Sequence, residues 1–385
     1  MQKKNTNILY EIILFCTIWV YYSLSARYIG FSVYSILRWV FPVLLVGVAI
    51  LLNKGNITVP PMLFWWFSLG VLLPSVLGAD PVTSIVKYIS WVLIFYGSYV
   101  YFMQLRTKEG MHQCLSLLCV VLVVFQLFNF VFAALGLNIV GGRGTGITTN
   151  ANVLGIYSNL AFWAGIYWNR QTKNGGIKLV WLAYLATTVY TMIASGSRTA
   201  FIVMVFNNLM LAFLFLKKRE YFWALVGVTS VLAVLAISGK LNFLGISAVQ
   251  RLSEEGGTQR TELWESGLNV WRENKLLGVG YTVSAMFNTA TKDMVFHNSY
   301  LSFLAECGLW GVCFLLIGIV PVILQIGHHF RKRQFIKSHP QFSIACAMLI
   351  SLAISAWSES FVFAVGSTEG FTFWFLMAWL MVYMV

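Results

Sequence analysis

Long apolar runs are the feature that most constrains how this chain folds. A run of about 20 apolar residues is long enough to cross the hydrocarbon core of a bilayer as an α-helix. In lipid the backbone must satisfy its own polar groups, which helices do within each segment. The sequence therefore predicts an all-α, polytopic transmembrane bundle of about twelve spans: 7–24, 31–52, 60–78, 83–104, 112–136, 151–169, 177–195, 199–216, 221–238, 299–326, 341–357 and 369–385.

The composition agrees with a membrane protein and argues against other classes. The 385 residues are 59% hydrophobic and only 10% charged, whereas soluble domains have about a quarter of their residues charged. The net charge of +13 fits basic cytoplasmic loops better than a nucleic-acid partner, so membrane lipids are the expected surroundings. No CxxC pair occurs among the six cysteines, and neither a zinc site nor a disulfide framework is predicted.

The distribution of Lys and Arg predicts the orientation. An even number of spans places both termini on one side, and fifteen cations then lie in or beside loops on that side. Only Arg27, Arg143 and Arg198 lie in the short loops of the other side. Cytoplasmic loops carry the excess of positive charge. Both termini are therefore expected in the cytoplasm of a multi-pass plasma (inner) membrane protein.

The predicted organisation has three parts. Residues 1–238 hold the first nine spans, 239–298 form one large external loop, and 299–385 hold the last three spans. Within the loop, residues 258–274 repeat Trp264, Leu268 and Trp271 at helical spacing, with charges on the other faces. This pattern predicts an amphipathic helix that either lies on the membrane surface or caps the bundle.

Three cations on the external side are candidate site residues. Arg143 lies in a loop rich in Gly and Thr, and Arg198 lies in a tight turn between two spans. Lys87 falls about one turn inside the fourth span, where an ionisable residue is costly and is a functional hypothesis by default. The alternative for each is a cation that reaches lipid phosphate from a helix end. That alternative is stronger for Arg27 and Arg38, since nothing around them in sequence resembles a site.

The large loop and the span after it supply the other candidates. Arg260 begins the amphipathic helix, where the simpler interpretation is a solvated helix charge. His297 precedes the tenth span and is the one histidine placed outside; it is either a proton acceptor near neutral pH or a structural cap. Glu306 lies nine residues deeper, and a buried carboxylate there needs a partner.

Together these residues resemble the O-antigen ligase and Wzy-type O-antigen polymerase superfamily of membrane glycosyltransferases. The likeness covers roughly residues 140–315, and no single motif carries it. Their order, spacing and common side of the membrane do. The motifs are the Arg143 loop leading to Asn150-x-Asn152, Ser197-Arg198-Thr199-Ala200, Arg260-x-x-Leu263-Trp264 with Trp271, Asn274-x-x-Leu277-Gly278-x-Gly280, His297-Asn298-Ser299-x-Leu301 and Glu306-x-Gly308-x-x-Gly311.

The resemblance implies a GT-C-like enzyme of the bacterial cell envelope that uses no nucleotide sugar and no cofactor. Its donor would be an oligosaccharide on undecaprenyl diphosphate at the periplasmic or outer face. Its acceptor would be the sugar hydroxyl of another lipid-linked unit in a polymerase, or a lipid A core in a ligase. A chain-length regulator and a flippase would be its protein partners in polysaccharide or lipopolysaccharide biosynthesis.

Chemistry assigns roles to the candidate residues. Breaking a glycosyl–diphosphate bond builds negative charge on the phosphates, which preorganised cations stabilise. Arginine matches phosphate by bidentate hydrogen bonding. The predicted diphosphate clamp consists of Arg143, Arg198, Arg260 and Lys87. The external segments contain no DxD motif, so no metal site is predicted there. His297 would accept the proton of the attacking hydroxyl in an inverting transfer, with Asn298 and Glu306 as supporting residues.

Two other classes remain open at this point. A lipid-linked oligosaccharide flippase or secondary transporter also has many spans and outward cations, but transporters usually place charges near the midplane between inverted repeats. No such repeat is evident in this sequence. A channel or structural membrane protein would leave the loop motifs unexplained. Polymerase and ligase are not separated by these residues, because both reactions need the same diphosphate clamp.

Overall fold

The protein is described by a computed structural model that covers residues 2–26, 31–52, 58–105, 107–215, 258–290, 294–364 and 366–385. These residues form an all-α structure with one small two-stranded sheet, β1 (Ile139–Val140) and β2 (Arg143–Gly144). The helices are α1 (Gln2–Leu24), α2 (Phe31–Leu52), α3 (Met62–Leu77), α4 (Pro81–Gln104), α5 (Lys108–Ala134), α6 (Ala151–Gln171), α7 (Gly175–Ser195), α8 (Arg198–Phe215), α11 (Thr258–Glu273), α12 (Ser299–Arg331), α13 (Arg333–Ser338), α14 (Pro340–Ser355) and α15 (Thr368–Tyr383).

The predicted spans coincide with helices wherever the structure describes them. Five described helices are long and apolar enough to cross a membrane, namely those at 81–104, 109–134, 175–195, 198–215 and 299–331. Shorter apolar helices lie at 11–24, 36–51, 62–77 and 340–355. The chain is thus a multi-pass membrane protein, while the count of about twelve spans stays a prediction. The expected span 221–238 and Arg27 lie outside the described residues.

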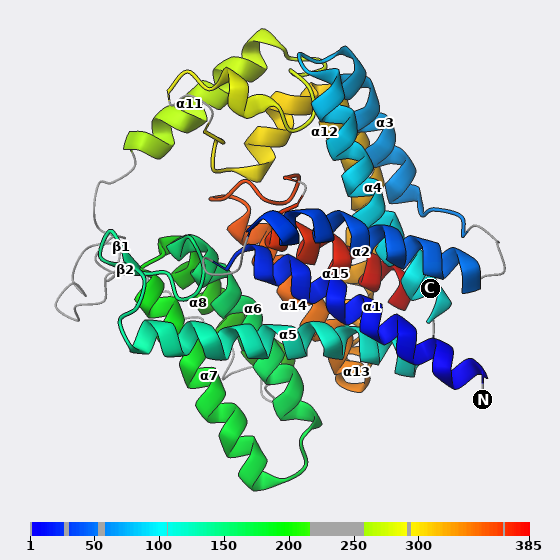
Figure 1. Cartoon of the computed structure of the whole chain (residues 1–385), viewed down its shortest axis with the longest axis vertical. Coiled ribbons are helices and arrows are strands. Elements are labelled where there is room, and N and C mark those ends of the chain that lie inside the picture. The colour runs from blue at the N-terminus through cyan, green and yellow to red at the C-terminus, as the bar shows by residue number, and fades with distance from the viewer. Residues whose placement is uncertain are drawn as a thin grey trace.

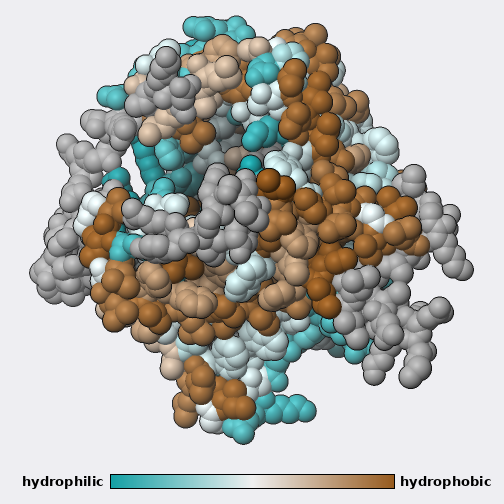
Figure 2. Space-filling view, viewed as in Figure 1, coloured by the Kyte–Doolittle hydropathy of each residue, from teal (hydrophilic) through white to brown (hydrophobic). Residues whose placement is uncertain are grey.

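Large apolar side chains cover much of the outer surface. Exposed examples are Leu51, Met62, Leu77, Val82, Leu179 and Leu324. Figure 2 shows these hydrophobic surfaces over α3 and α12 and across the middle of the view, with hydrophilic residues gathered over α11. Such a surface is stable against lipid, because lipid is as apolar as the side chains that it contacts.

The centre of the bundle is built around α14 and α15. The α15 helix is buried along almost its whole length, and α14 packs against α15, α6 and α8 (Figure 1). Trp374 on α15 contacts Phe67 of α3 and Trp91 of α4 with ring centroids 5.3 Å apart in both pairs. These contacts join the N-terminal and C-terminal helices into one core, and they hold the ends of α14 and α15 in place.

The amphipathic helix is present, but its buried face differs from the predicted one. The α11 helix buries Leu263, Gly267 and Val270, while Trp264 and Trp271 lie at the edge of this face. A Cβ on Gly267 would lie 3.0 Å from side-chain atoms of Leu301 and Phe296, so the face is shaped by α12. Of the two predicted placements, α11 takes the one that caps the bundle, since it packs against α12.

Glycines lock the loop after α11 onto α12. Gly308 interrupts α12 with φ +60° and ψ −163°, a conformation that is essentially restricted to glycine. Val279 N donates to Ala305 O at 3.0 Å and Gly280 N to Glu306 O at 2.9 Å. A Cβ on Gly278 or Gly308 would collide with backbone across this contact. The Gly278-x-Gly280 and Glu306-x-Gly308 motifs therefore hold the loop after α11 on α12.

Candidate functional site

Segments that are distant in sequence meet at the loop between α14 and α15. Ser299, the first residue of α12, holds this loop: its backbone N donates to Ala356 O at 2.8 Å, and its Oγ donates to Glu359 O at 2.7 Å. Phe361 N donates in turn to Ser299 Oγ at 3.0 Å. These bonds fix the backbone on both sides of Glu359, so the direction of its side chain is set by the start of α12.

The carboxylate of Glu359 is the centre of the site. It accepts hydrogen bonds from Asn152 Nδ2 at 2.6 Å and from Arg260 Nη2 at 3.3 Å, both on Oε1. Its Oε2 lies 3.0 Å from His297 Nδ1. The Glu359 side chain is only 15% exposed, whereas Arg260 and His297 are 33% and 26% exposed. The carboxylate is thus less exposed than the Arg260 and His297 side chains that it binds. We call Glu359, Arg260, His297, Asn152 and Arg143 the Glu359 network.

Arg143 joins this network from the β1–β2 hairpin. Its Nη2 donates to Asn152 Oδ1 at 2.6 Å and its Nε donates to Ser195 O at 2.7 Å. The hairpin pairs Val140 with Arg143, and the two glycines between them adopt positive φ, as a tight turn of this kind requires. The side chain of Arg143 is therefore held by the end of α7 and by the start of α6.

Arg198 lies next to the Ser195 carbonyl that accepts from Arg143. The turn between α7 and α8 passes through Gly196, which caps α7 in the left-handed conformation with φ +56°. Arg198 is the first residue of α8 and is half-buried. Arg143 and Arg198 thus lie at the same turn, with Arg198 three residues after the Ser195 carbonyl that accepts from Arg143.

His297 has a constrained backbone and a carboxylate next to its Nδ1. Its φ of +49° is unusual for a residue with a Cβ, and Asn298 behind it caps α12 by accepting from Tyr300 N and Leu301 N at 3.0 and 3.1 Å. An ionised carboxylate only accepts hydrogen bonds. Glu359 therefore favours the proton on Nδ1 of a neutral His297, which leaves Nε2 as the basic nitrogen. Asn298 supports the site as a helix cap and by its N–H to Ser360 Oγ at 2.9 Å.

Glu306 does not join the Glu359 network. It is buried, and its Oε1 accepts from Ser284 Oγ at 2.7 Å. The carboxyl group lines a small cavity of about 70 Å³ with Ser299, Ser302 and Ser360. The partner expected for this carboxylate is therefore a serine hydroxyl rather than a cation.

Lys87 also lies apart from the network. Among the described residues it has no hydrogen bond or ion pair with Glu359, and the charge that acts on it most is that of Arg38 on α2. The predicted clamp is thus divided. Arg143 and Arg260 converge on the Glu359 network and Arg198 lies beside it. Lys87 instead lies near a second cation, Arg38.

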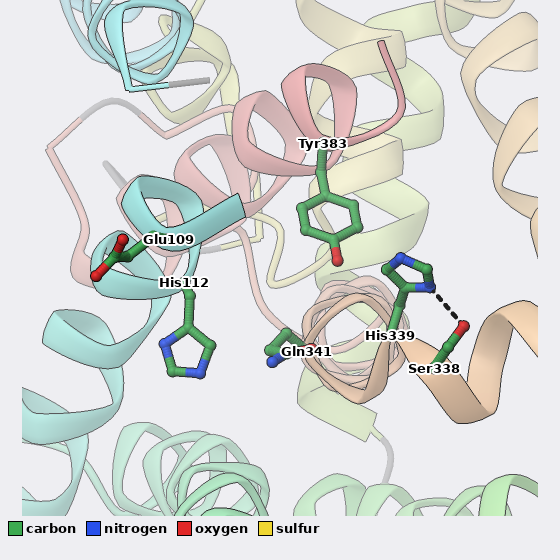
Figure 3. A pocket seen from close by; sticks show the side chains of 6 residues that line it. All are labelled: Glu109, His112, Ser338, His339, Gln341 and Tyr383. Carbon is green, nitrogen blue, oxygen red and sulfur yellow. Dashed lines mark hydrogen bonds between the residues drawn. The ribbon is translucent and has the colours of Figure 1, made fainter. Parts of the chain in front are cut away.

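A larger pocket lies at the opposite end of the bundle, between the starts of α5 and α14 and the end of α15. It measures about 310 Å³ and is lined by Glu109, His112, Ser338, His339, Gln341 and Tyr383. Figure 3 shows the two imidazoles well separated, the Glu109 carboxylate turned away from both, and His339 bonded to Ser338. No group of three or more His, Cys, Asp or Glu within the described ranges is arranged to hold a metal. This pocket lacks arginine and carries none of the motifs.

Glu359 itself was missed by sequence reasoning. It lies in the short segment between two predicted spans, within Ser358-Glu359-Ser360, and no motif considered above includes it. The available signal was a lone carboxylate on the same predicted side as Arg143, Arg198 and Arg260. A carboxylate there needs cationic partners, and those cations lie about 100 to 220 residues earlier in the chain.

The fold and the network define a polytopic helical membrane protein with an arginine-rich polar site at one end of its bundle. Residues 183–316 match the Wzy_C family model, described as O-antigen ligase. The match confirms the predicted resemblance and includes Arg198, Arg260 and His297. Members of this family are membrane enzymes that transfer lipid-linked glycans in polysaccharide biosynthesis. No curated protein matches the chain.

Proposed function

We propose that this protein is a membrane polysaccharide polymerase. It transfers a glycan from undecaprenyl diphosphate to the sugar hydroxyl of another lipid-linked repeat unit, with inversion and without a metal. The observation that carries this proposal is the convergence of Arg143, Arg260 and His297, from three distant segments, on one Glu359–Asn152 network.

The arginines serve as the diphosphate clamp. Arg143, Arg198 and Arg260 bring three positive charges to a region where Glu359 supplies one negative charge. Arg260 has five N–H donors, and its bond to Glu359 engages Nη2 only. The guanidinium is thereby oriented while other donors face a ligand. Cations placed in advance stabilise the charge that develops on the leaving diphosphate, which is the role that a metal plays in other transferases.

His297 and Glu359 activate the acceptor. Glu359 holds Nδ1–H, so Nε2 accepts the proton of the acceptor hydroxyl as its oxygen attacks the anomeric carbon. The bond between that carbon and the diphosphate oxygen breaks, and undecaprenyl diphosphate leaves with the electron pair. Glu359 then stabilises the imidazolium that has formed. The proton, the new glycosidic bond and the leaving group are all accounted for without a covalent intermediate.

A ligase is the second candidate, and the name of the matching family model favours it. Its chemistry at the donor is identical, and only the acceptor differs, being lipid A core or another acceptor in place of a second lipid-linked unit. In either reaction the site faces the periplasm or exterior, where a flippase delivers the donor, and a chain-length regulator would act on the polymerase. Both termini then lie in the cytoplasm.

The decisive experiment is reconstitution of the purified protein with one lipid-linked repeat unit and no other acceptor. A ladder of lengthening products supports the polymerase, and reaction only after addition of lipid A core supports the ligase. If neither mixture reacts but the protein moves the lipid-linked unit across a proteoliposome bilayer, the protein is a flippase and the proposal is wrong.

The chain offers a matched control for this assay. Arg272 lies on the same helix as Arg260, is exposed, and donates from Nη1 to Asn269 Oδ1 within α11 at 2.8 Å. Arg272→Ala therefore removes one positive charge from α11 without touching the network. We expect Arg260→Ala to abolish most of the turnover and Arg272→Ala to retain it.

A further inference from the structure

Two cations, Arg38 on α2 and Lys87 on α4, lie near each other and away from the Glu359 network. Both helices begin at the end of the bundle that carries the network: the chain before α2 bridges to the Arg143 loop through Ala26 and Thr148, and Ala79 before α4 donates to Val279 O at 2.8 Å. At a rise of about 1.5 Å per residue, Arg38 and Lys87 lie roughly 10 and 9 Å inside their helices. The two side chains lie close enough for their charges to interact, on helices that pack together.

Neither cation has a counter-charge in the described part of the chain. The two ion pairs among the described residues are both formed by Glu359, one with Arg260 and one with His297. Arg38 and Lys87 instead act on each other through like charges, and Lys87 is half-buried. Arg38 Nε is buried and has no hydrogen-bond partner among the residues that the structure describes. Two like charges and an unpaired donor are costly at this depth unless an anion joins them.

The Arg38 side chain is held in place even though its Nε is unpaired. The guanidinium carbon lies 5.0 Å from the centre of the neighbouring Trp39 ring, a cation–π contact. A Cβ on Gly366 would lie 2.9 Å from Nη1, so the guanidinium packs against the backbone of the loop that carries Glu359. The buried Tyr21 donates to Arg38 O at 3.2 Å and stacks on Phe371. The guanidinium is therefore oriented by Trp39 and by the backbone at Gly366, while the Arg38 side chain is only partly exposed.

We propose that Arg38 and Lys87 form a second anion site, which binds the phosphate group of a lipid. Arginine offers phosphate two parallel N–H donors, and lysine adds a compact point charge. A phosphate between them converts the repulsion into two charge-assisted contacts and provides an acceptor for Nε. The Arg38 end of the site lies against Gly366. The proposal holds whether or not the protein transfers glycans. The phosphate belongs either to an isoprenoid lipid or to a bilayer phospholipid.

Lipid retention by the full-length protein in detergent tests this site. The probes are undecaprenyl phosphate in one arm and phosphatidylglycerol in the other, each titrated and counted by native mass spectrometry. Arg38→Gln and Lys87→Gln should each weaken retention of one of the two lipids at least tenfold. Lys178→Gln, an exposed cation on α7, should leave retention unchanged. The arm that responds identifies the source of the phosphate.

Thermal melting and a conservative variant are the controls for correct folding of these proteins. Without added lipid, Lys87→Gln should melt at or above the wild-type temperature, because a like-charge repulsion has been removed, and Lys87→Arg should retain the lipid. If Arg38→Gln and Lys87→Gln hold both lipids as tightly as the wild type, the second site does not exist. If only Arg260→Ala lowers retention, the phosphate binds at the Glu359 network, which overturns this inference and leaves the proposed function standing.

Discussion

Replacing Glu359 by glutamine tests the logic of the site with the smallest change of shape. In the wild type both Asn152 Nδ2 and Arg260 Nη2 donate to Oε1, and His297 Nδ1 faces Oε2. The amide oxygen of Gln takes the Oε1 position, because two donors require an acceptor there. The amide NH₂ then faces His297 Nδ1 and forces it to accept. The imidazole proton moves to Nε2, the nitrogen that must take the proton of the acceptor hydroxyl.

The expected loss follows from this change of tautomer. The equivalent substitution in a carboxylate–histidine–nucleophile triad costs about four orders of magnitude in turnover, and each order of magnitude corresponds to about 1.4 kcal/mol of barrier. We expect Glu359→Gln to lower the rate of glycan transfer by roughly 10³- to 10⁴-fold, or about 4 to 5.5 kcal/mol. The loss of charge-assisted bonds should lower the free energy of unfolding by only about 1 to 3 kcal/mol.

The assay is single-turnover transfer from a radiolabelled lipid-linked repeat unit to acceptor, with enzyme in excess, beside a melting curve of each protein. Glu262→Gln on the exposed side of α11 is the control for loss of one carboxylate, and it should transfer at the wild-type rate. A Glu359→Gln protein that folds and transfers within about threefold of the wild type would refute the role of Glu359 as the residue that orients His297.

Three further substitutions extend the test. Arg260→Ala should lower the transfer rate by about 10²- to 10³-fold, as loss of one preorganised donor does, and Arg272→Ala should not; equal rates would contradict the clamp. Asn152→Ala removes the link between Arg143 and Glu359 and should lower the transfer rate about tenfold at unchanged melting temperature. An unchanged rate would mean that this link does not contribute to transfer. Gly308→Ala places a Cβ against the Leu276 backbone in a conformation that only glycine adopts readily, so stability measured by thermal melting should fall by at least about 2 kcal/mol; an unchanged melting curve would contradict it.

Much of the fold was predictable because lipid imposes a simple rule on sequence. A span must be predominantly apolar, so its ends are visible in the hydropathy pattern. The predicted runs 31–52 and 177–195 became helices Phe31–Leu52 and Gly175–Ser195. The face of α11 was less predictable. Both tryptophans were assigned to the buried side, but close packing on Phe296 and Leu301 requires Gly267 at the contact.

The site was only partly predictable, because its contacts join distant segments. Arg143, Arg260 and His297 were chosen by residue type, motif and predicted side, and the structure brings these three together. Glu359 lies 62 residues from His297 and 207 from Asn152, and nothing in the sequence near it indicates those partners. The partners of Lys87 and Glu306 depend in the same way on which helices pack together, which hydropathy alone does not determine.

The rate at which the His297→Ala protein cleaves the donor tests the central claim most directly. Purified wild-type protein, given a lipid-linked donor and an acceptor, should release undecaprenyl diphosphate in step with the new glycosidic bond. His297→Ala should bind the donor with wild-type affinity, because the clamp is intact, yet release undecaprenyl diphosphate at least about 10²-fold more slowly, since a positioned proton acceptor contributes that much or more. Release at the wild-type rate by a folded His297→Ala protein would show that the Glu359 network is not the site of glycan transfer.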